Sequence, residues 1–225
     1  MASLSVIVNT CANGPRANIL SSGRQPYADR RWLLRSVILP AYTVWFKDLF
    51  KEVIVVGEFE EGPGYTYVHC PSVHFNCGDA LVQRQKGFEA LKDTAIPWVV
   101  FSHDDHLLDP DTIVAPSEPA DVLSPSRWTR SRCTAGEPLN DGSGLWPSAG
   151  NENPGFVPEV PQYVNGHVCL MRPSVFRNGF KWTDSPPVFT WDMRVTERLQ
   201  QLRTRIRYAP EIRTYDVEAG AEPWV

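Results

Sequence analysis

Hydrophobic residues along this chain follow two patterns, short continuous runs and stripes at helical spacing. Continuous runs of β-branched and aliphatic residues are typical of strands buried on both faces of a parallel sheet. Runs of this kind lie at 4–9, 53–57, 98–101 and 163–171. Weaker patterns predict further short strands at 65–68, 120–123 and 206–209.

Apolar residues three and four positions apart predict the helices between these strands. The longest such pattern runs from Arg30 to Phe50, and Pro40 within it should kink or divide the helix. Further helices are expected at 79–93 and 192–202, with short ones beginning at Asp111 and Arg172.

The alternation of strands and helices predicts the fold class. It indicates a single α/β domain with a mostly parallel, Rossmann-like sheet that helices flank on both faces. Two segments rich in glycine, proline and polar residues, 10–29 and 134–162, are predicted to be long loops. Long loops in compact domains are usually functional or mobile.

The net charge of the chain limits the partners that it can attract. The 26 acidic and 22 basic residues give a net charge of −4, so the whole chain has no general attraction to nucleic acid. A local basic run near the C-terminus is more often a solvated helix face than a binding patch. Its members are Arg194, Arg198, Arg203, Arg205, Arg207 and Arg213.

Targeting signals and cysteine usage favour a soluble, cytoplasmic protein of a cell or of an infected host. No basic region precedes a long apolar one at the N-terminus, and no window reaches the roughly 18 apolar residues of a membrane span. Five scattered cysteines fit a reducing compartment. Four residues are of the types that bind zinc, but no second ligand pair lies at the spacing of a zinc finger. Ordinary strand and loop roles are therefore favoured for them. These residues are His69, Cys70, His74 and Cys77.

The segment PWVVFSHDDHLLDPD at 97–111 carries the clearest chemistry. Its apolar strand ends in His103-Asp104-Asp105-His106, and ligands of open α/β sheets bind at the carboxyl ends of strands. Carboxylates and imidazoles gathered there suit a divalent cation that neutralises a diphosphate. An acidic turn that caps a helix is the alternative. It accounts less well for the strand, the four ligands and Asp109-Pro110-Asp111 occurring together.

Other blocks follow in a recognisable order. The strand at 53–57 ends in acids, and Gly78 and Arg84 lie in the helix before the 97–111 segment. YVNGHVCLMRPSVF at 163–176 and TWDMRVTERL at 190–199 come next. In this order the blocks resemble glycosyltransferases of the GT-A fold, most of all the large family 2 group. The resemblance implies a GT-A-type fold, a nucleoside-diphosphate sugar as donor and a divalent metal.

The resemblance also implies metal ligands. The family's motif has acids at the positions of His103 and Asp105, so Asp105 would bind the ion directly and His103 would replace the first acid. Asp104, between them, would hold the nucleotide ribose or a coordinating water. His106 is an alternative ligand. Oxygen and imidazole donors together favour Mn²⁺ somewhat over Mg²⁺.

Trp191-Asp192 lies where similar enzymes often have Glu-Asp, six residues before an arginine, here Arg198. The resemblance implies that Asp192 is the general base that takes the acceptor hydroxyl proton, with inversion at the sugar. The positive end of a helix dipole keeps such a carboxylate ionised. An acidic residue at this position is also an ordinary feature of helix N-termini.

In this fold the ends of the first two strands hold the base and ribose of the nucleotide. The candidates are Asn9, Thr10, Glu58 and Glu60, with Glu58 nearest to the family's acid at the second strand. Arg84 falls where similar enzymes have an arginine that faces the diphosphate or supports the nucleotide pocket. All of these residues are equally plausible as loop or helix-surface positions. Tryptophans that could stack on a sugar, or simply fill the core, are Trp146, Trp182 and Trp191.

The expected activity is metal-dependent transfer of a sugar to an acceptor hydroxyl. Residues 1–115 would form the nucleotide-sugar and metal-binding half, and 116–225 the acceptor-binding half. Compatible acceptors are a saccharide, a protein, a small molecule, or a hydroxymethylated base of viral DNA, which would have to be flipped out of the duplex. A nucleotidyltransferase and a catalytically degenerate GT-A binding module are the alternatives. Residues 10–16 only faintly resemble the phosphate loop of a nucleotidyltransferase.

Overall fold

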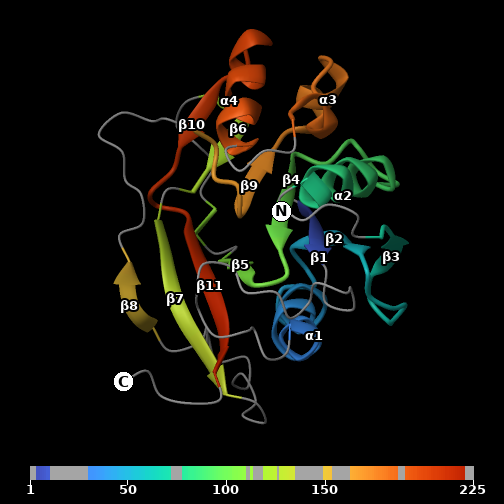
Figure 1. Cartoon of the computed structure of the whole chain (residues 1–225), viewed down its shortest axis with the longest axis vertical. Helices are drawn as coiled ribbons and strands as arrows, with labels where there is room; N and C mark the ends of the chain where they lie inside the picture. The colour runs from blue at the N-terminus through green and yellow to red at the C-terminus, as the bar shows by residue number, and fades with distance from the viewer. Residues whose placement is uncertain are drawn as a thin grey trace.

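Two sheets organise the molecule (Figure 1). The computed structural model describes residues 4–10, 30–71, 78–109, 112–113, 119–125, 127–134, 149–153, 163–186 and 191–220. The larger sheet has seven strands in the order β10-β6-β9-β4-β1-β2-β3. In chain order these strands are β1 (Leu4–Thr10), β2 (Phe50–Gly57), β3 (Thr66–His69), β4 (Trp98–His103), β6 (Val122–Ser124), β9 (Val168–Met171) and β10 (Ile206–Tyr208).

The strand order determines where a ligand would bind. The chain adds β2 and β3 in parallel on one side of β1, then returns to add β4 in parallel on the other side. The topological switch point therefore lies between β1 and β4, with Asn9 opposite His103 at their carboxyl ends. In open α/β sheets, ligands bind at this edge. Of the described strands in this sheet, β9 alone runs antiparallel to its neighbours, β4 and β6.

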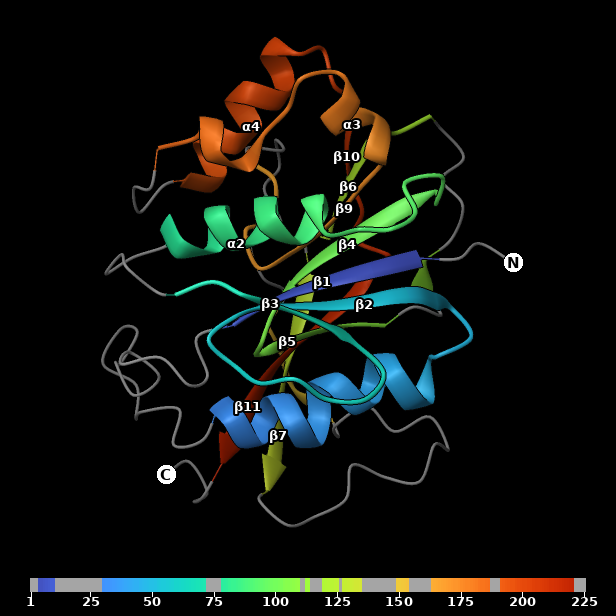
Figure 2. The same ribbon diagram turned by 90° about the vertical axis from the view of Figure 1, so that its right-hand side faces the viewer.

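Helices cover both faces of the large sheet (Figure 2). One face carries α2 (Gly78–Glu89), α3 (Pro173–Arg177) and α4 (Trp191–Gln201), and the other carries the segment that begins with α1 (Arg30–Leu33). Successive residues of β1 point to opposite faces, so Val6 and Val8 belong to one hydrophobic core and Ile7 to the other. Both faces must therefore be apolar, which explains the continuous apolar runs in these strands. The predicted α/β fold is confirmed.

The helix predicted from Arg30 to Phe50 is shorter than expected. After α1 come two π-helical segments, η1 (Leu34–Ile38) and η2 (Ala41–Trp45), with Pro40 between them. The chain then turns, and Phe50 begins β2 because it pairs with Leu4 and is buried against the sheet. The Leu4 backbone N–H also donates a 2.7 Å hydrogen bond to the Leu49 carbonyl.

The smaller sheet has four strands in the order β5-β11-β7-β8. They are β5 (His106–Leu108), β7 (Arg127–Thr134), β8 (Ala149–Asn153) and β11 (Arg213–Gly220). β5, β7 and β11 were not predicted from the sequence, and β8 corrects part of the predicted loop at 134–162. β7 and β11 run parallel side by side (Figure 1).

Several expectations fall partly or wholly outside the described residues. They concern the predicted loop after Thr10, most of the predicted helix from Asp111, the side chains of Trp146, His74 and Cys77, and Asp111 itself. The strand predicted at 163–171 is reduced to β9. Across the described ranges, no helix combines the length and apolar character needed to cross a bilayer.

Candidate functional site

The four residues from His103 to His106 lie where the chain passes from one sheet to the other. His103 ends β4, Asp104 and Asp105 form a turn, and His106 begins β5. The next residues, Leu107 and Leu108, are completely buried, so their apolar side chains draw the chain into the core. A strand therefore begins at the last residue of the tetrad, where the alternative interpretation predicted a helix capped by the acids.

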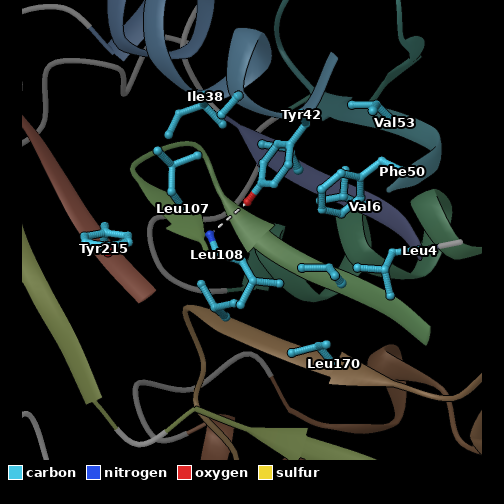
Figure 3. Close-up of a cluster of buried hydrophobic side chains, with 14 of the residues drawn as sticks. Leu4, Val6, Ile38, Tyr42, Phe50, Val53, Leu107, Leu108, Leu170 and Tyr215 are labelled. Atoms are coloured by element: carbon cyan, nitrogen blue, oxygen red, sulfur yellow. Dashed lines mark hydrogen bonds between the residues drawn. The ribbon is translucent and has the colours of Figure 1, made fainter. Parts of the chain in front are cut away.

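Tyr42, in η2, forms a hydrogen bond to β5, the strand that follows the turn. The Leu108 backbone N–H donates a 3.2 Å hydrogen bond to the Tyr42 hydroxyl oxygen, deep in the apolar cluster of Figure 3. Burial raises the pKa of Tyr42 to about 12, so the phenol stays neutral. The helical layer thus fixes the end of β5, two residues after His106.

Asp104 joins the two strands at the switch point. It is 1% exposed, and the Thr10 hydroxyl donates a 2.7 Å hydrogen bond to its Oδ2. This bond connects the carboxyl end of β1 to that of β4. The structure therefore brings two of the predicted nucleotide-binding residues, Thr10 and Asp104, into direct contact.

Three imidazole rings meet beside this turn. The rings of His106 and His167 stack with centroids 4.5 Å apart, and His103 lies 5.4 Å from His167 and 6.2 Å from His106. His106 Nδ1 is 2.6 Å from Asp105 Oδ1, with both side chains buried. Burial, and secondarily the positive charge of Arg84, hold the pKa of His103 well below its ordinary value, so this ring is neutral.

The donor chemistry of this cluster fits a divalent ion. His103 Nε2 is buried and has no hydrogen-bond partner within the described part of the chain, which is unusual for a polar atom unless a ligand binds it. A carboxylate on one imidazole nitrogen, as Asp105 provides for His106, is the usual support of a metal-binding histidine. Among the described residues, no group of three or more His, Cys, Asp or Glu side chains has an arrangement that could hold a metal ion.

His167 belongs to a turn that is well braced. The Asn165 side-chain oxygen accepts the His167 backbone N–H at 2.8 Å, and the Asn165 side-chain amide donates to the Pro125 carbonyl. The Asn165 backbone N–H donates to the Ser124 hydroxyl at 2.8 Å. The turn is thereby tied to the end of β6, so the backbone of His167 has a defined position although its side chain is exposed.

Arg84 holds the same turn from α2. Its guanidinium donates 2.7 and 3.3 Å hydrogen bonds to the carbonyls of Gly166 and His167, and a 3.3 Å bond to Asn9 Oδ1. The guanidinium carbon lies 4.8 Å from the ring centre of Trp182 and 5.2 Å from that of Trp191. The side chain is completely buried. Of the two predicted roles, support of the pocket fits this geometry better than facing a diphosphate.

The end of β2 adds a carboxylate to the same edge. Gly57 has φ +138°, and a Cβ there would lie 1.8 Å from the Thr10 carbonyl oxygen, so only glycine allows β1 and β2 to approach so closely. Glu58 follows, and its Oε2 is buried without a hydrogen-bond partner among the described residues. Glu60 instead forms ion pairs with Arg31 and Arg35 on the surface, which makes it a poorer nucleotide ligand.

Asp192 lies next to the His167 turn. A Cβ built on Gly166 would be 3.5 Å from the Asp192 Cβ and 3.0 Å from Trp191 Cζ2, so the start of α4 packs against this turn. Asp192 Oδ1 accepts the Met193 backbone N–H at 2.9 Å. Burial raises the pKa of Asp192 above its ordinary value, which makes the carboxylate a better proton acceptor.

The structure also describes the predicted tryptophans, the C-terminal arginines and two of the zinc candidates. Trp182 is fully buried and Trp191 nearly so, and both pack in the core beside Arg84. Among the C-terminal arginines, four form ion pairs with acids, which leaves less positive charge for a nucleic acid. The pairs are Arg194–Glu197, Arg198–Asp184, Arg205–Asp121 and Arg207–Glu211. His69 contacts Tyr67, and Cys70 is buried.

His167 is a residue of the site that was not predicted from the sequence. It lies in the 163–176 block, directly before a strand, where an imidazole is not distinctive by itself. Its position depends on β9 running antiparallel to β4, which brings the residue before β9 to the edge where β4 ends. The hydrophobic pattern of a strand does not show its direction in the sheet, so the position of His167 could not be found from the sequence.

Comparison with known proteins identifies the fold. No protein-family model and no curated protein sequence matches the chain. Among solved structures, GalNAc-T7 with UDP, GalNAc and Mn²⁺ aligns with a TM-score of 0.57 at 9% identity, over 98% of this chain and 45% of that one. The inositol-1-phosphate CTP transferase of T. maritima aligns with a TM-score of 0.51 at 13% identity, over 98% of this chain and 91% of that one.

A third solved structure is the catalytic domain of Drosophila β1,4-galactosyltransferase 7 with xylobiose. It has a TM-score of 0.48 and 9% identity, over 92% of this chain and 65% of that one. The chain thus spans about half to two thirds of the glycosyltransferases it matches. At these identities the likeness concerns the fold alone. The GT-A resemblance predicted from the sequence is confirmed at that level, and the fold is one that nucleotide-sugar transferases and a nucleotidyltransferase share.

Proposed function

We propose that the chain is a metal-dependent glycosyltransferase that moves a sugar from a nucleoside-diphosphate donor to an acceptor hydroxyl with inversion. One observation carries the proposal. At the switch point of a GT-A-type sheet, buried carboxylates and the imidazoles around them lie beside Asp192, a carboxylate whose pKa is raised by burial. The cluster suits a metal-bound diphosphate, and the carboxylate suits a general base.

The nucleotide is assigned to the ends of β1 and β2. Asn9 and Thr10 end β1. The buried Oε2 of Glu58, which has no hydrogen-bond partner among the described residues, offers an acceptor to an N–H or O–H of the nucleoside. Asp104 is proposed to hold the ribose or a water of the metal. Arg84 is proposed to support this pocket through Asn9 without touching the donor.

The ion is assigned to ligands drawn from His103, Asp105 and His106. A divalent cation bound there would neutralise the negative charge that develops on the departing diphosphate. Imidazole and carboxylate donors favour Mn²⁺ over Mg²⁺. The Asp105–His106 hydrogen bond and the buried Nε2 of His103 support this assignment.

Asp192 is proposed as the general base, contributed by the acceptor half of the chain. Its carboxylate would take the proton of the acceptor hydroxyl as the hydroxyl oxygen bonds to the anomeric carbon and the bond from that carbon to the diphosphate oxygen breaks. A base on the face of the sugar opposite the diphosphate gives inversion. The ion-paired arginines favour a saccharide or small-molecule acceptor over DNA.

Nucleotidyl transfer is the second candidate. It rests on the likeness to the inositol-1-phosphate CTP transferase, which covers 91% of that chain, whereas the glycosyltransferases are covered less completely. Both reactions would place a metal-bound phosphate at the carboxyl edge of the sheet. They differ in the phosphate that leaves, a nucleoside diphosphate in the first and pyrophosphate in the second.

Donor hydrolysis tests the proposal. The protein is incubated with UDP-, GDP-, CDP-, ADP- and dTDP-sugars, each with and without Mn²⁺, and the released nucleoside diphosphate is measured. We expect Mn²⁺-dependent hydrolysis of one donor. Once an acceptor is found, Asp192→Asn should lower its transfer rate by roughly 10²- to 10⁴-fold. The matched control is Asp48→Asn, an exposed aspartate in the turn before β2, at the opposite edge of the sheet.

Two results would contradict glycosyl transfer. Release of pyrophosphate from a nucleoside triphosphate in the presence of a sugar phosphate, without hydrolysis of any sugar donor, would establish the nucleotidyltransferase. No turnover in either assay, combined with a rise in melting temperature caused by a nucleotide, would favour the binding module.

A further inference from the structure

We propose that Tyr67 is a positioning residue for nucleotide binding. Its hydroxyl holds the backbone on both sides of Glu58, so that the Glu58 carboxylate keeps one position in which it can accept a hydrogen bond from the nucleoside. The inference rests on the role proposed above for Glu58, and it adds a residue of β3 that does not itself touch the donor. The same arrangement would serve glycosyl transfer and nucleotidyl transfer alike.

Tyr67 lies in β3, the outermost strand beside β2 (Figure 1). Its hydroxyl donates a 3.0 Å hydrogen bond to the Gly57 carbonyl, and its oxygen accepts the Phe59 backbone N–H at 3.2 Å. A phenol hydroxyl has one proton and two acceptor lone pairs, and His69 Nδ1, 3.1 Å away, can donate the third hydrogen bond. The two peptide groups that flank the Glu58 Cα are therefore bonded to one side-chain oxygen.

β1 holds the same backbone from the other side of β2. The Glu58 backbone N–H donates a 3.3 Å hydrogen bond to the Thr10 carbonyl, and the Gly57 carbonyl also accepts the Cys70 backbone N–H at 3.1 Å. Gly57 has φ +138°, a conformation that L side chains rarely adopt, so the chain leaves β2 in a direction that glycine permits. With the backbone held from both sides, only the side-chain torsions of Glu58 remain to be set.

The Glu58 side chain has an atom that suits a ligand. Its Oε2 is buried and has no hydrogen-bond partner among the described residues. Buried polar atoms usually have a partner, and an unsatisfied one costs free energy. An N–H or O–H of a bound nucleoside would satisfy this oxygen. A carboxylate that already has its bound position loses less conformational freedom on binding, so the contacts of Tyr67 should raise the affinity for the nucleotide.

Tyr65 provides a matched control in the same segment. Its hydroxyl donates a 2.9 Å hydrogen bond to the Glu60 carbonyl, two residues beyond Glu58, and both tyrosines are partly buried. Replacement of either tyrosine by phenylalanine keeps the ring and removes a hydroxyl that is bonded to the backbone. The melting temperature without nucleotide should therefore fall by a similar amount in the two variants, whereas only Tyr67→Phe releases the peptide groups next to Glu58.

The test is calorimetric titration of the full chain with UDP, GDP, CDP, ADP and dTDP, each with and without Mn²⁺. The nucleotide that binds most tightly is then titrated into the variants. We expect Glu58→Ala to weaken its binding about 10- to 100-fold, which corresponds to loss of a hydrogen bond to a charged group. Tyr67→Phe should weaken binding about fivefold, and Tyr65→Phe should leave it unchanged.

The double variant Tyr67→Phe/Glu58→Ala separates positioning from a merely structural role. If Tyr67 acts through Glu58, its replacement should change the affinity by less than about twofold once the carboxylate is absent. If Tyr67 only stabilises the fold, the roughly fivefold loss should be the same with and without Glu58.

The possible outcomes distinguish the inference from the proposed function. Equal losses in the two backgrounds, or unchanged affinity in Tyr67→Phe or in Glu58→Ala, would overturn the inference and leave a donor hydrolysis already measured unaffected. Coupling between Tyr67 and Glu58 in a protein that hydrolyses no sugar donor would uphold the inference and refute the glycosyltransferase. No binding of any of the five nucleotides at millimolar concentration would refute the proposed function and the inference together.

Discussion

Replacement of Arg84 by methionine tests how the candidate site is held together. The guanidinium is completely buried between α2, the end of β1 and the turn at Gly166 and His167. Methionine keeps the unbranched side chain and much of its volume, but it cannot donate a hydrogen bond. The substitution therefore removes the polar contacts without opening a large cavity.

The expected loss follows from the contacts. The 2.7 Å bond to the Gly166 carbonyl is charge-assisted and contributes about 2 kcal/mol, and the two 3.3 Å bonds contribute about 1 kcal/mol each. The contacts with Trp182 and Trp191 add about 2 kcal/mol. Relief of the cost of burying a charge, together with the apolar contacts of methionine, returns about 3 kcal/mol. The free energy of unfolding should thus fall by about 3 kcal/mol.

Urea unfolding followed by circular dichroism measures this difference, provided that the slope with denaturant is unchanged. Arg172→Met is the matched control. Arg172 also lies over an aromatic ring, 4.5 Å from the Trp98 centroid, but it is half-buried, and its guanidinium donates a 2.7 Å hydrogen bond to the Ala120 carbonyl. We expect its replacement to cost about 1 kcal/mol. A loss below 1 kcal/mol for Arg84→Met, or one equal to that of Arg172→Met, would show that these polar contacts do not hold the site together.

Three further predictions concern single positions. Because burial raises the pKa of Asp192, its favourable contribution to stability is present below the unfolded-state pKa and is lost as pH rises through the folded-state pKa. Asp192→Asn should therefore unfold at a higher temperature than the unmodified protein at pH 7. In the unmodified protein, the acidic limb of the pH–rate profile should lie above pH 3.8, the ordinary pKa of aspartate. Gly57→Ala should lose more than about 3 kcal/mol of stability, because its Cβ would clash with the Thr10 carbonyl. Gly179 has φ +94° but open space around it, so Gly179→Ala should lose only about 1–2 kcal/mol. Equal losses of the two variants in urea unfolding would contradict this prediction. Tyr42→Phe leaves the Leu108 N–H without its acceptor and should cost about 1–2 kcal/mol by the same assay, and no loss would show that this bond is unimportant.

The central strands and the edge that carries the site could be predicted from the sequence. β1, β2 and β4 are buried on both faces, and such burial leaves a continuous apolar run that can be recognised locally. The tetrad directly after β4 could be placed at the carboxyl edge for the same reason. Asp192 could be placed at the start of α4 because helical periodicity is also local.

The second sheet could not be predicted in this way. Its strands β7, RWTRSRCT, and β11, RTYDVEAG, have few consecutive apolar residues, and they pair in parallel although Arg127 and Arg213 are far apart in sequence. β5 has only three residues, too few to show a periodic pattern. These strands form because of the partners they meet, and local propensity does not contain that information.

The residues of the site could likewise be predicted where they depend on one element, and not where they depend on contacts between elements. From the sequence alone it could be predicted that imidazoles and carboxylates follow β4, that an acid lies at the start of α4, and that Gly57 ends β2 with Glu58 directly after it. Three relationships come from the folded chain: His167 lies beside the other two imidazoles, Asp105 contacts His106, and Arg84 is enclosed in the core. Side-chain periodicity reflects burial within one element, whereas these three relationships arise from contacts between elements whose order and direction the sheet alone sets.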